Sequence, residues 1–200
     1  MALFVTLEGI DGTGKTTLAG RLERRLRERG IDVVRTMEPT SSWVGEAVRR
    51  AVDEDADPRV QALLFLADRS LHTEEIEAWL ADGLVVLCDR YHDSTLAYQG
   101  VALEGRVEDP RGWLERASEF LTLEPDLTLL LLLDPAEGLA RKSTTRTRSP
   151  FERVAFLVKV QEAYQELAAG QPRFVKLDAA LPNGELAKVA EGALLSRLQG

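Results

Sequence analysis

The sequence has few of the features that mark secreted, metal-binding or membrane proteins. Cys88 is its one cysteine, which excludes a disulfide within the chain and is typical of a buried thiol in a cytoplasmic protein. Its two histidines, His72 and His92, do not have the spacing of metal ligands, so we expect surface or hydrogen-bonding roles for both. The apolar run at residues 129–133, like the others in the sequence, is far too short to span a bilayer, so we expect no membrane segment.

Positive charge is scarce relative to negative charge. The 200 residues include 25 Lys and Arg against 33 Asp and Glu, which gives a formal net charge of −8. A nucleic-acid surface needs a basic face, so this balance argues against a nucleic-acid partner. An anionic substrate would instead have to be held by arginines that are concentrated locally. The first residues enter an apolar run without a basic segment before it, so we expect a cytoplasmic protein.

What the sequence does contain is a phosphate-loop motif close to its start. Residues 9–16 read G-I-D-G-T-G-K-T and match the Walker A pattern G-x-x-x-x-G-K-[ST] between a predicted strand and a predicted helix. In such a loop, backbone N–H groups surround phosphate oxygens, the lysine reaches the β- and γ-phosphates, and the hydroxyl can bind Mg²⁺. The alternative is a chance glycine-rich turn, and the strand–loop–helix context favours nucleotide binding. The predicted nucleotide-binding residues are Gly9, Ile10, Asp11, Gly12, Thr13, Gly14, Lys15, Thr16 and Thr17.

Strand and helix signals alternate along the rest of the chain. Apolar segments predict strands at 3–7, 32–36, 84–88, 127–133 and 173–177. Capping and periodicity signals predict helices at 15–29, 44–52, 57–81, 110–121, 136–145, 149–169 and 183–197. This order predicts an α/β fold, a single three-layer α/β/α domain over residues 1–200 with a mostly parallel, five-stranded sheet.

Two carboxylates follow apolar strands and compete for a second role at the nucleotide. Asp89 follows the run at 84–88, and Asp134 follows the run at 127–133. Either could hold Mg²⁺ through water, as a Walker B carboxylate does, and either could simply cap a helix. Position at a strand end does not separate the two.

The segment that begins at residue 89 carries a more specific signal. Residues 89–100 read D-R-Y-H-D-S-T-L-A-Y-Q-G and resemble the thymidylate kinase signature D-R-Y-x-x-S-x-x-A-Y-Q-G. Residues 8–17 resemble that family's phosphate loop, 38–39 its E-P motif and 64–72 its F-x-A-D-R-x-x-H helix, and 177–179 look like its late strand. The chain is therefore similar to the P-loop nucleoside monophosphate kinases of this family, a fold with a short helical lid, here at about residues 136–150.

The resemblance implies that dTMP is the phosphate acceptor. By similarity, Asp11 would accept a hydrogen bond from the sugar 3′-hydroxyl group, and Arg49 and Arg90 would hold the acceptor phosphate. Tyr98 would lie beneath the sugar and crowd a 2′-hydroxyl group, and Glu38 would belong to the same site.

The resemblance also implies a pocket for the thymine base. Phe65 would stack on the ring, Arg69 would meet its O4 atom, and Ser94 and Gln99 would lie beside it. Two alternatives come from the residues themselves. Phe65 could be an ordinary core residue, and Arg69 could pair with a neighbouring carboxylate.

On the donor side, the resemblance implies ATP with Mg²⁺. Lys15 would contact the phosphates, and Thr16 and Asp89 would hold the metal. The loop after the last strand, with Ala179 and Ala180, would meet adenine.

Cations gather between the fourth predicted strand and the next helix, where a lid covers ATP in this family. Relatives without an arginine in the phosphate loop carry catalytic arginines in the lid, and position 12 is glycine here. The lid candidates, which join Lys15 and Arg90 as predicted catalytic residues, are Arg141, Arg146 and Arg148. Which of the three contacts the transferred phosphoryl group stays open. Many relatives have D-R-F-E at the lid's end, whereas residues 149–152 read S-P-F-E, so contacts from the missing pair are not carried over.

Together the motifs predict an ATP:dTMP phosphotransferase that forms dTDP for dTTP biosynthesis. A rival on a similar loop is a deoxynucleoside kinase, which would accept an uncharged nucleoside. A rival from another class is a nucleotide-dependent switch ATPase, which would respond to a protein partner. The resemblance alone implies a homodimer.

Overall fold

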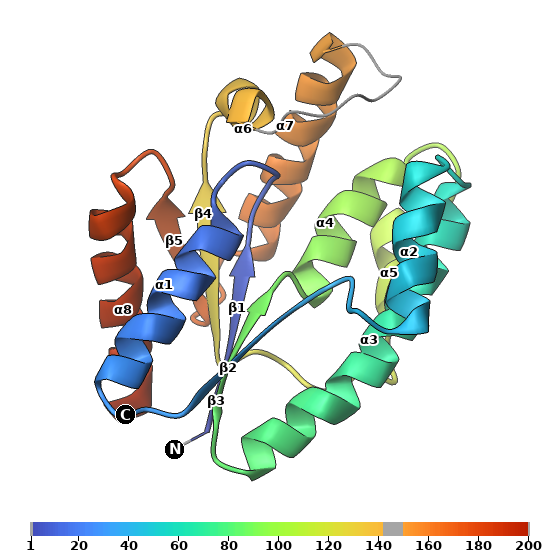
Figure 1. The fold of residues 1–200 in the computed structure, drawn as a ribbon. Coiled ribbons are helices and arrows are strands. Elements are labelled where there is room, and N and C mark those ends of the chain that lie inside the picture. Colours follow the sequence, from blue (N-terminus) through green and yellow to red (C-terminus); the bar gives the residue numbers. More distant parts are fainter. Residues whose placement is uncertain (1, 142–149, 200) are drawn as a thin grey trace.

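A parallel sheet runs through the middle of the molecule (Figure 1). In the computed structural model, which describes residues 2–141 and 150–199, the sheet has five strands in the order β2-β3-β1-β4-β5. Their bounds are β1 Leu3–Glu8, β2 Val33–Met37, β3 Val85–Asp89, β4 Leu127–Leu132 and β5 Phe174–Asp178. Every pairing between them is parallel, so the carboxyl ends of the strands meet at one edge of the sheet.

Helices cover both faces of this sheet. Their bounds are α1 Lys15–Glu28, α2 Trp43–Asp53, α3 Pro58–Ala81, α4 His92–Ala102, α5 Pro110–Ala117, α6 Pro135–Arg141, α7 Pro150–Leu167 and α8 Asn183–Gln199. Helices α1 and α8 lie together on one face, and α3, α4 and α7 lie on the other (Figure 1). The described part of the chain therefore has the three predicted layers.

Side-chain alternation along the strands divides the core between the two faces. On β1, Leu3, Val5 and Leu7 pack with α1 and α8, whereas Phe4 packs on the opposite side with Ile76 of α3. All six residues of β1 are buried because helices cover both faces of the central strand.

The predicted strands agree with the structure to within one residue at each end, but the helices contain two errors. Helix α4 was not predicted, because its buried positions include Asp93, Ser94 and Thr95 and so carry no apolar period. The helix predicted to reach residue 121 ends at Ala117, where the Ser118 hydroxyl donates to the Leu114 carbonyl at 2.7 Å. Of the predicted helix 136–145, α6 covers the described part and 142–145 lie outside the described residues.

No helix among the described residues is long and apolar enough to cross a membrane.

Candidate active site

The phosphate loop lies at the carboxyl edge of the sheet, between β1 and α1. Gly14 takes a left-handed φ of 88° just before α1, which favours glycine at this turn. The ammonium of Lys15 folds back over the loop and donates to the carbonyls of Ile10 at 2.8 Å and Gly9 at 3.0 Å. Burial, together with the nearby Arg90 charge, lowers the pKa of Lys15 to about 7. The lysine side chain thus lies against the backbone of its own loop.

Thr16 and Asp89 meet beside the loop. The Thr16 hydroxyl donates to Asp89 Oδ2 at 2.5 Å, which joins the start of α1 to the end of β3. Asp134, the other candidate, instead accepts hydrogen bonds from the backbone N–H groups of Ala136 and Glu137 and caps α6. The geometry therefore brings Asp89, and not Asp134, to the hydroxyl of the loop.

These two oxygen donors suit a hard cation. Hydroxyl and carboxylate oxygens are the ligands that Mg²⁺ prefers, and Mg²⁺ at nucleotide sites keeps several waters and phosphate oxygens as further ligands. The described residues contain no group of three or more His, Cys, Asp or Glu side chains that would form a complete metal site of their own. Thr16 and Asp89 could thus hold Mg²⁺ together with a bound nucleotide.

Arg90 connects the phosphate loop to α4. Its Nη2 donates to Asp11 Oδ1 at 2.6 Å and to the Tyr98 hydroxyl at 3.4 Å. Its Nη1 donates to the Gly9 carbonyl at 3.2 Å and to Ser94 Oγ at 3.1 Å. The residue itself has a left-handed φ of 72°, a conformation that non-glycine residues rarely adopt and that is common at functional sites. The guanidinium is thus fixed beside the loop that would carry the donor phosphates.

Below Arg90 lies a buried carboxylate that the sequence did not reveal. Glu8, the last residue of β1, accepts from the Tyr91 N–H at 2.8 Å, from Ser94 Oγ at 2.6 Å and from the Tyr164 hydroxyl at 2.9 Å. Complete burial, reinforced by the charge of Asp93, raises the pKa of Glu8 to about 7. The Tyr164 hydroxyl also lies 3.4 Å from Arg90 Nη1, so α7 helps to hold the arginine.

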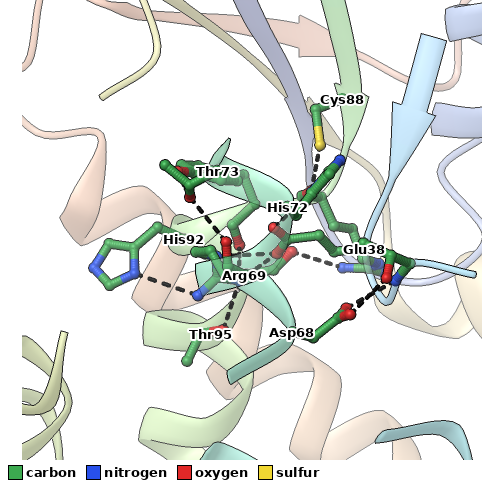
Figure 2. A network of polar contacts seen from close by, with 12 residues as sticks. Glu38, Asp68, Arg69, His72, Thr73, Cys88, His92 and Thr95 are labelled. Carbon is green, nitrogen blue, oxygen red and sulfur yellow. Dashed lines mark hydrogen bonds and ion pairs between the residues drawn. The ribbon is translucent and has the colours of Figure 1, made fainter. Parts of the chain in front are cut away.

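A second buried network surrounds Arg69 (Figure 2). The guanidinium is 1% exposed and donates to Glu38 Oε2 from Nε at 3.0 Å and from Nη2 at 2.6 Å. Nη2 also donates to the Tyr91 carbonyl at 2.9 Å and to Thr95 Oγ1 at 3.0 Å. The alternative interpretation, that Arg69 pairs with a carboxylate, is therefore confirmed. Thr95 of α4, which was not predicted as a site residue, contacts this guanidinium. Its neighbour Ser94 does not, because the Ser94 side chain is turned toward Glu8 and Arg90.

His72 extends this network to the sheet. Its Nδ1 lies 3.0 Å from Glu38 Oε1, and its Nε2 lies 2.7 Å from Thr36 Oγ1 on β2. The expectation of a surface role is wrong for His72, which is 1% exposed, whereas the expectation of a hydrogen-bonding role is confirmed. The error arose because one histidine on an otherwise mixed helical face carries no burial signal.

The loop after β2 is tied to α3 by another missed residue, Asp68. Its buried carboxylate accepts from the Thr40 N–H at 2.8 Å, from Thr40 Oγ1 at 2.6 Å and from Ser42 Oγ at 3.0 Å. Arg49 of α2 donates to the carbonyls of Thr40 at 2.7 Å and Pro39 at 3.1 Å. Arg49 is exposed and reaches this loop, and the loop follows the Glu38-Pro39 peptide, which is cis.

The remaining predicted acceptor residues differ in burial. Phe65 is half-buried on α3, four residues before Arg69, so it is not the fully buried core residue of the alternative interpretation. Gln99 is 8% exposed on α4. Tyr98 lies over Arg90, whose guanidinium carbon is 4.9 Å from the ring centre, and its hydroxyl accepts from the Asp11 N–H at 3.0 Å.

At the opposite side of the phosphate loop, Arg141 ends α6. Its Nη1 donates to the Ala179 carbonyl at 3.3 Å, and its Nη2 donates to Glu137 at 2.5 Å. Arg141 thus contacts the loop after β5, where Ala180 donates its N–H to Asp178 at 2.9 Å. The other lid candidates, Arg146 and Arg148, lie outside the described residues.

The phosphate loop and α6 touch through their backbones. A Cβ atom built on Gly12, whose φ is 83°, would lie 2.0 Å from the Gly138 carbonyl oxygen. A Cβ atom on Gly138 would in turn lie 2.7 Å from the Asp11 carbonyl oxygen. Real Cβ contacts of this length do not occur, so position 12 accommodates glycine in this arrangement.

Comparison with known proteins agrees with this geometry. A family model described as "Thymidylate kinase" matches residues 7–189. A "Probable thymidylate kinase" of Methanoculleus marisnigri is 44% identical over 194 residues, which cover 96% of this chain and 94% of that protein. One of Methanospirillum hungatei is 43% identical with 98% and 95% covered, and one of Natronomonas pharaonis is 39% identical with 88% and 89% covered.

Proposed function

Because the chain belongs to the thymidylate kinase family, we propose that it transfers the γ-phosphoryl group of ATP to dTMP. A phosphate oxygen of dTMP attacks the γ-phosphorus, the bond to the β–γ bridging oxygen breaks, and dTDP and ADP are the products. The observation that carries the proposal is the position of Arg90, which hydrogen-bonds both to the phosphate loop at Gly9 and Asp11 and to α4 at Ser94. A cation there can hold an acceptor phosphate next to the donor.

The donor would bind along the phosphate loop. Lys15 would exchange the carbonyls of Gly9 and Ile10 for the β- and γ-phosphates of ATP. Thr16 and Asp89 would hold Mg²⁺, which neutralises developing phosphate charge when bound. Ala179 and Ala180 would border the adenine.

The acceptor would need positioning but no general base. A phosphate monoester has a second pKa near 6, so it is already a dianion and a competent nucleophile at neutral pH. Arg90 would hold that phosphate, with Arg49 at the rim, and Asp11 would accept from the 3′-hydroxyl group. Tyr98, whose ring packs against Arg90, would leave little room for a 2′-hydroxyl group. Positioning and charge stabilisation would therefore supply most of the rate.

The base would lie against Phe65 and Arg69. Glu38 neutralises Arg69 and fixes its plane, and this makes Glu38 a supporting residue of the acceptor site. Thr95 joins Arg69 at the same place and offers a further polar contact, while Ser94 supports Arg90. Gln99 stays a proposed neighbour of the base on the strength of the resemblance.

The transferred group would also meet lid arginines. Gly12 excludes an arginine from that position of the loop, so the charge must come from elsewhere. Arg141 contacts the adenine-side loop at Ala179, which favours a role in binding the nucleotide base. Arg146 and Arg148, outside the described residues, are then the proposed contacts of the phosphoryl group.

We propose that the enzyme is a cytoplasmic homodimer made of one domain per chain. Helix α3 carries Val60, Leu63 and Leu71 on one face, and they are 48%, 53% and 41% exposed. Trp43, at the start of the neighbouring α2, is 77% exposed. An apolar stripe of this kind is suited to a symmetric contact with a second copy of the chain.

The proposal is tested by ADP release over a panel of acceptors with MgATP. We expect kcat/KM to fall in the order dTMP, dUMP, then dCMP and UMP, with thymidine last. Loss of the methyl group is worth about 1–3 kcal/mol, whereas dCMP would place an amino group opposite the Arg69 guanidinium, so that two donors would face each other without an acceptor. Thymidine as the best acceptor would show a nucleoside kinase. ADP release that no acceptor stimulates would favour a switch ATPase.

A further inference from the structure

His72 connects the sheet to the arginine of the proposed base pocket without reaching that pocket itself. Its imidazole is completely buried between β2 and the E-P segment (Figure 2). One ring nitrogen lies against Thr36 and the other against Glu38, and Glu38 in turn holds Arg69. The four side chains form a continuous path.

The chemistry of these partners selects the form of the ring. Glu38 is paired with the Arg69 guanidinium, so its Oε1 is an acceptor, and Nδ1 of His72 must donate to it. Nε2 can then accept from the Thr36 hydroxyl. In this arrangement His72 has no spare donor for a ligand, and its effect is exerted on Glu38.

The two oxygens of the Glu38 carboxylate have different partners, and this shows how His72 could affect Arg69. Arg69 uses Oε2 twice, through Nε and Nη2, and His72 holds Oε1. Without a donor at Oε1, the carboxylate can rotate so that both oxygens face Arg69. Rotation of the pair would shift Nη2 relative to Thr95, the contact that orients the guanidinium toward α4.

We propose that His72 is a positioning residue for base selection, which fixes the plane of Arg69 through Glu38. The inference rests on the proposed function, in which Arg69 meets the thymine O4 atom. Its measurable consequence is that the preference for dTMP over dCMP depends on the Nδ1 hydrogen bond of a residue that touches neither nucleotide.

Two amide variants separate the two ends of the ring. In His72→Asn the amide nitrogen takes the place of Nδ1 and can still donate to Glu38, whereas in His72→Gln the amide reaches the Nε2 position beside Thr36. We expect His72→Asn to keep the dTMP/dCMP ratio of kcat/KM within about threefold, and His72→Gln to lower it about 10–100-fold, the range expected for one hydrogen bond to a charged group. The loss should arise in the KM for dTMP, with the KM for ATP unchanged.

A matched control removes a neighbouring buried hydrogen bond on α3 that does not involve the Glu38 carboxylate. The Thr73 hydroxyl, also on α3, donates to the Arg69 carbonyl and contacts the Tyr91 hydroxyl. Thr73→Val should therefore lower the melting temperature without changing the selectivity ratio. If Thr73→Val and both His72 variants change the ratio equally, or if His72→Gln leaves it unchanged, the positioning role is refuted.

A measurement on the unaltered protein covers the case in which a variant does not fold. With two histidines in the chain, imidazole ¹⁵N spectra are simple to assign with His92→Gln. We expect His72 to show a protonated Nδ1 and a resonance that responds to dTMP. An unresponsive resonance overturns the inference. Absence of dTMP phosphorylation by the unaltered enzyme would instead overturn the proposed function.

Discussion

Nucleotide binding should be accompanied by proton uptake at Lys15. In the protein alone, burial and the Arg90 charge hold the pKa of Lys15 at about 7, well below its ordinary value of 10.5. Phosphate oxygens favour the charged amine and should return this pKa to above 9. At pH 8 Lys15 is then protonated in the nucleotide complex, whereas in the protein alone it is largely neutral.

The magnitude follows from the titration curve. Because the pKa of Lys15 is about 7 before binding, Lys15 should take up about 0.1 proton at pH 6 and about 0.9 proton at pH 8 when the nucleotide binds. The second ionisation of the ligand phosphate, near pH 6, is complete at pH 8 and does not contribute there. The lowered pKa of Lys15 also affects stability. Between pH 7 and 10.5 the lysine is protonated in the unfolded chain but not in the folded chain. The contribution of Lys15 to the free energy of unfolding therefore rises with pH across this window.

Titration calorimetry with MgADP in buffers of different ionisation enthalpy measures this uptake directly. The slope of the observed enthalpy against buffer ionisation enthalpy should be close to one proton at pH 8, where the ligand phosphate is already fully ionised. Lys15→Arg, which cannot lose its proton, should give a slope near zero at pH 8. Lys188→Met, at an exposed position of α8, should behave like the unaltered protein. A flat dependence for the unaltered protein at pH 8 would show that Lys15 is already charged in the empty loop.

Two further predictions concern the helices beside the loop. Arg141→Ala should raise the KM for ATP several-fold and leave kcat within about threefold, because Arg141 contacts Ala179 on the proposed adenine side. A fall in kcat of about 10³-fold, the effect of losing an arginine finger, would contradict a role limited to nucleotide binding. Tyr164→Phe should raise the KM for dTMP about 10-fold, because Glu8 and Arg90 lose a shared hydroxyl group. Tyr91→Phe is the control, since it removes a buried hydroxyl group away from Arg90 and should leave this KM unchanged. Equal effects of the two variants in steady-state kinetics would count against a role of Tyr164 in holding Arg90.

The sheet could be predicted from the sequence because its central strands are covered on both faces. Such strands are rich in apolar residues, as in the run at 129–133, and a run of this kind can be recognised without knowledge of the partner strands. Helix α4 could not be predicted in the same way. Its buried side chains are polar and are satisfied by distant groups, as Asp93 is by Arg173 at 2.8 Å. Only the folded chain shows that these residues face inward.

The residues of the candidate site also differ in how far they could be predicted from the sequence. Residues carried by contiguous motifs, such as Lys15, Arg90 and Arg69, could be selected from sequence, although their roles stay predictions. Residues recruited across the fold could not. Glu8 and Tyr164 are 156 positions apart, and a tyrosine on a helical stretch gives no sign that it will bond a carboxylate at the end of β1. The choice between Asp89 and Asp134 likewise needed the position of Thr16.

The backbone contact between Gly12 and Gly138 restricts how this catalyst could change over time. An arginine at position 12 would require α6 to withdraw, because the first carbon of its side chain already overlaps the Gly138 carbonyl. Withdrawal of α6 would also carry Arg141 away from the loop after β5. An arginine at position 12 and the contact of Arg141 with Ala179 therefore exclude each other in this arrangement. A larger residue at position 12 should therefore become acceptable only together with a change in the position of α6.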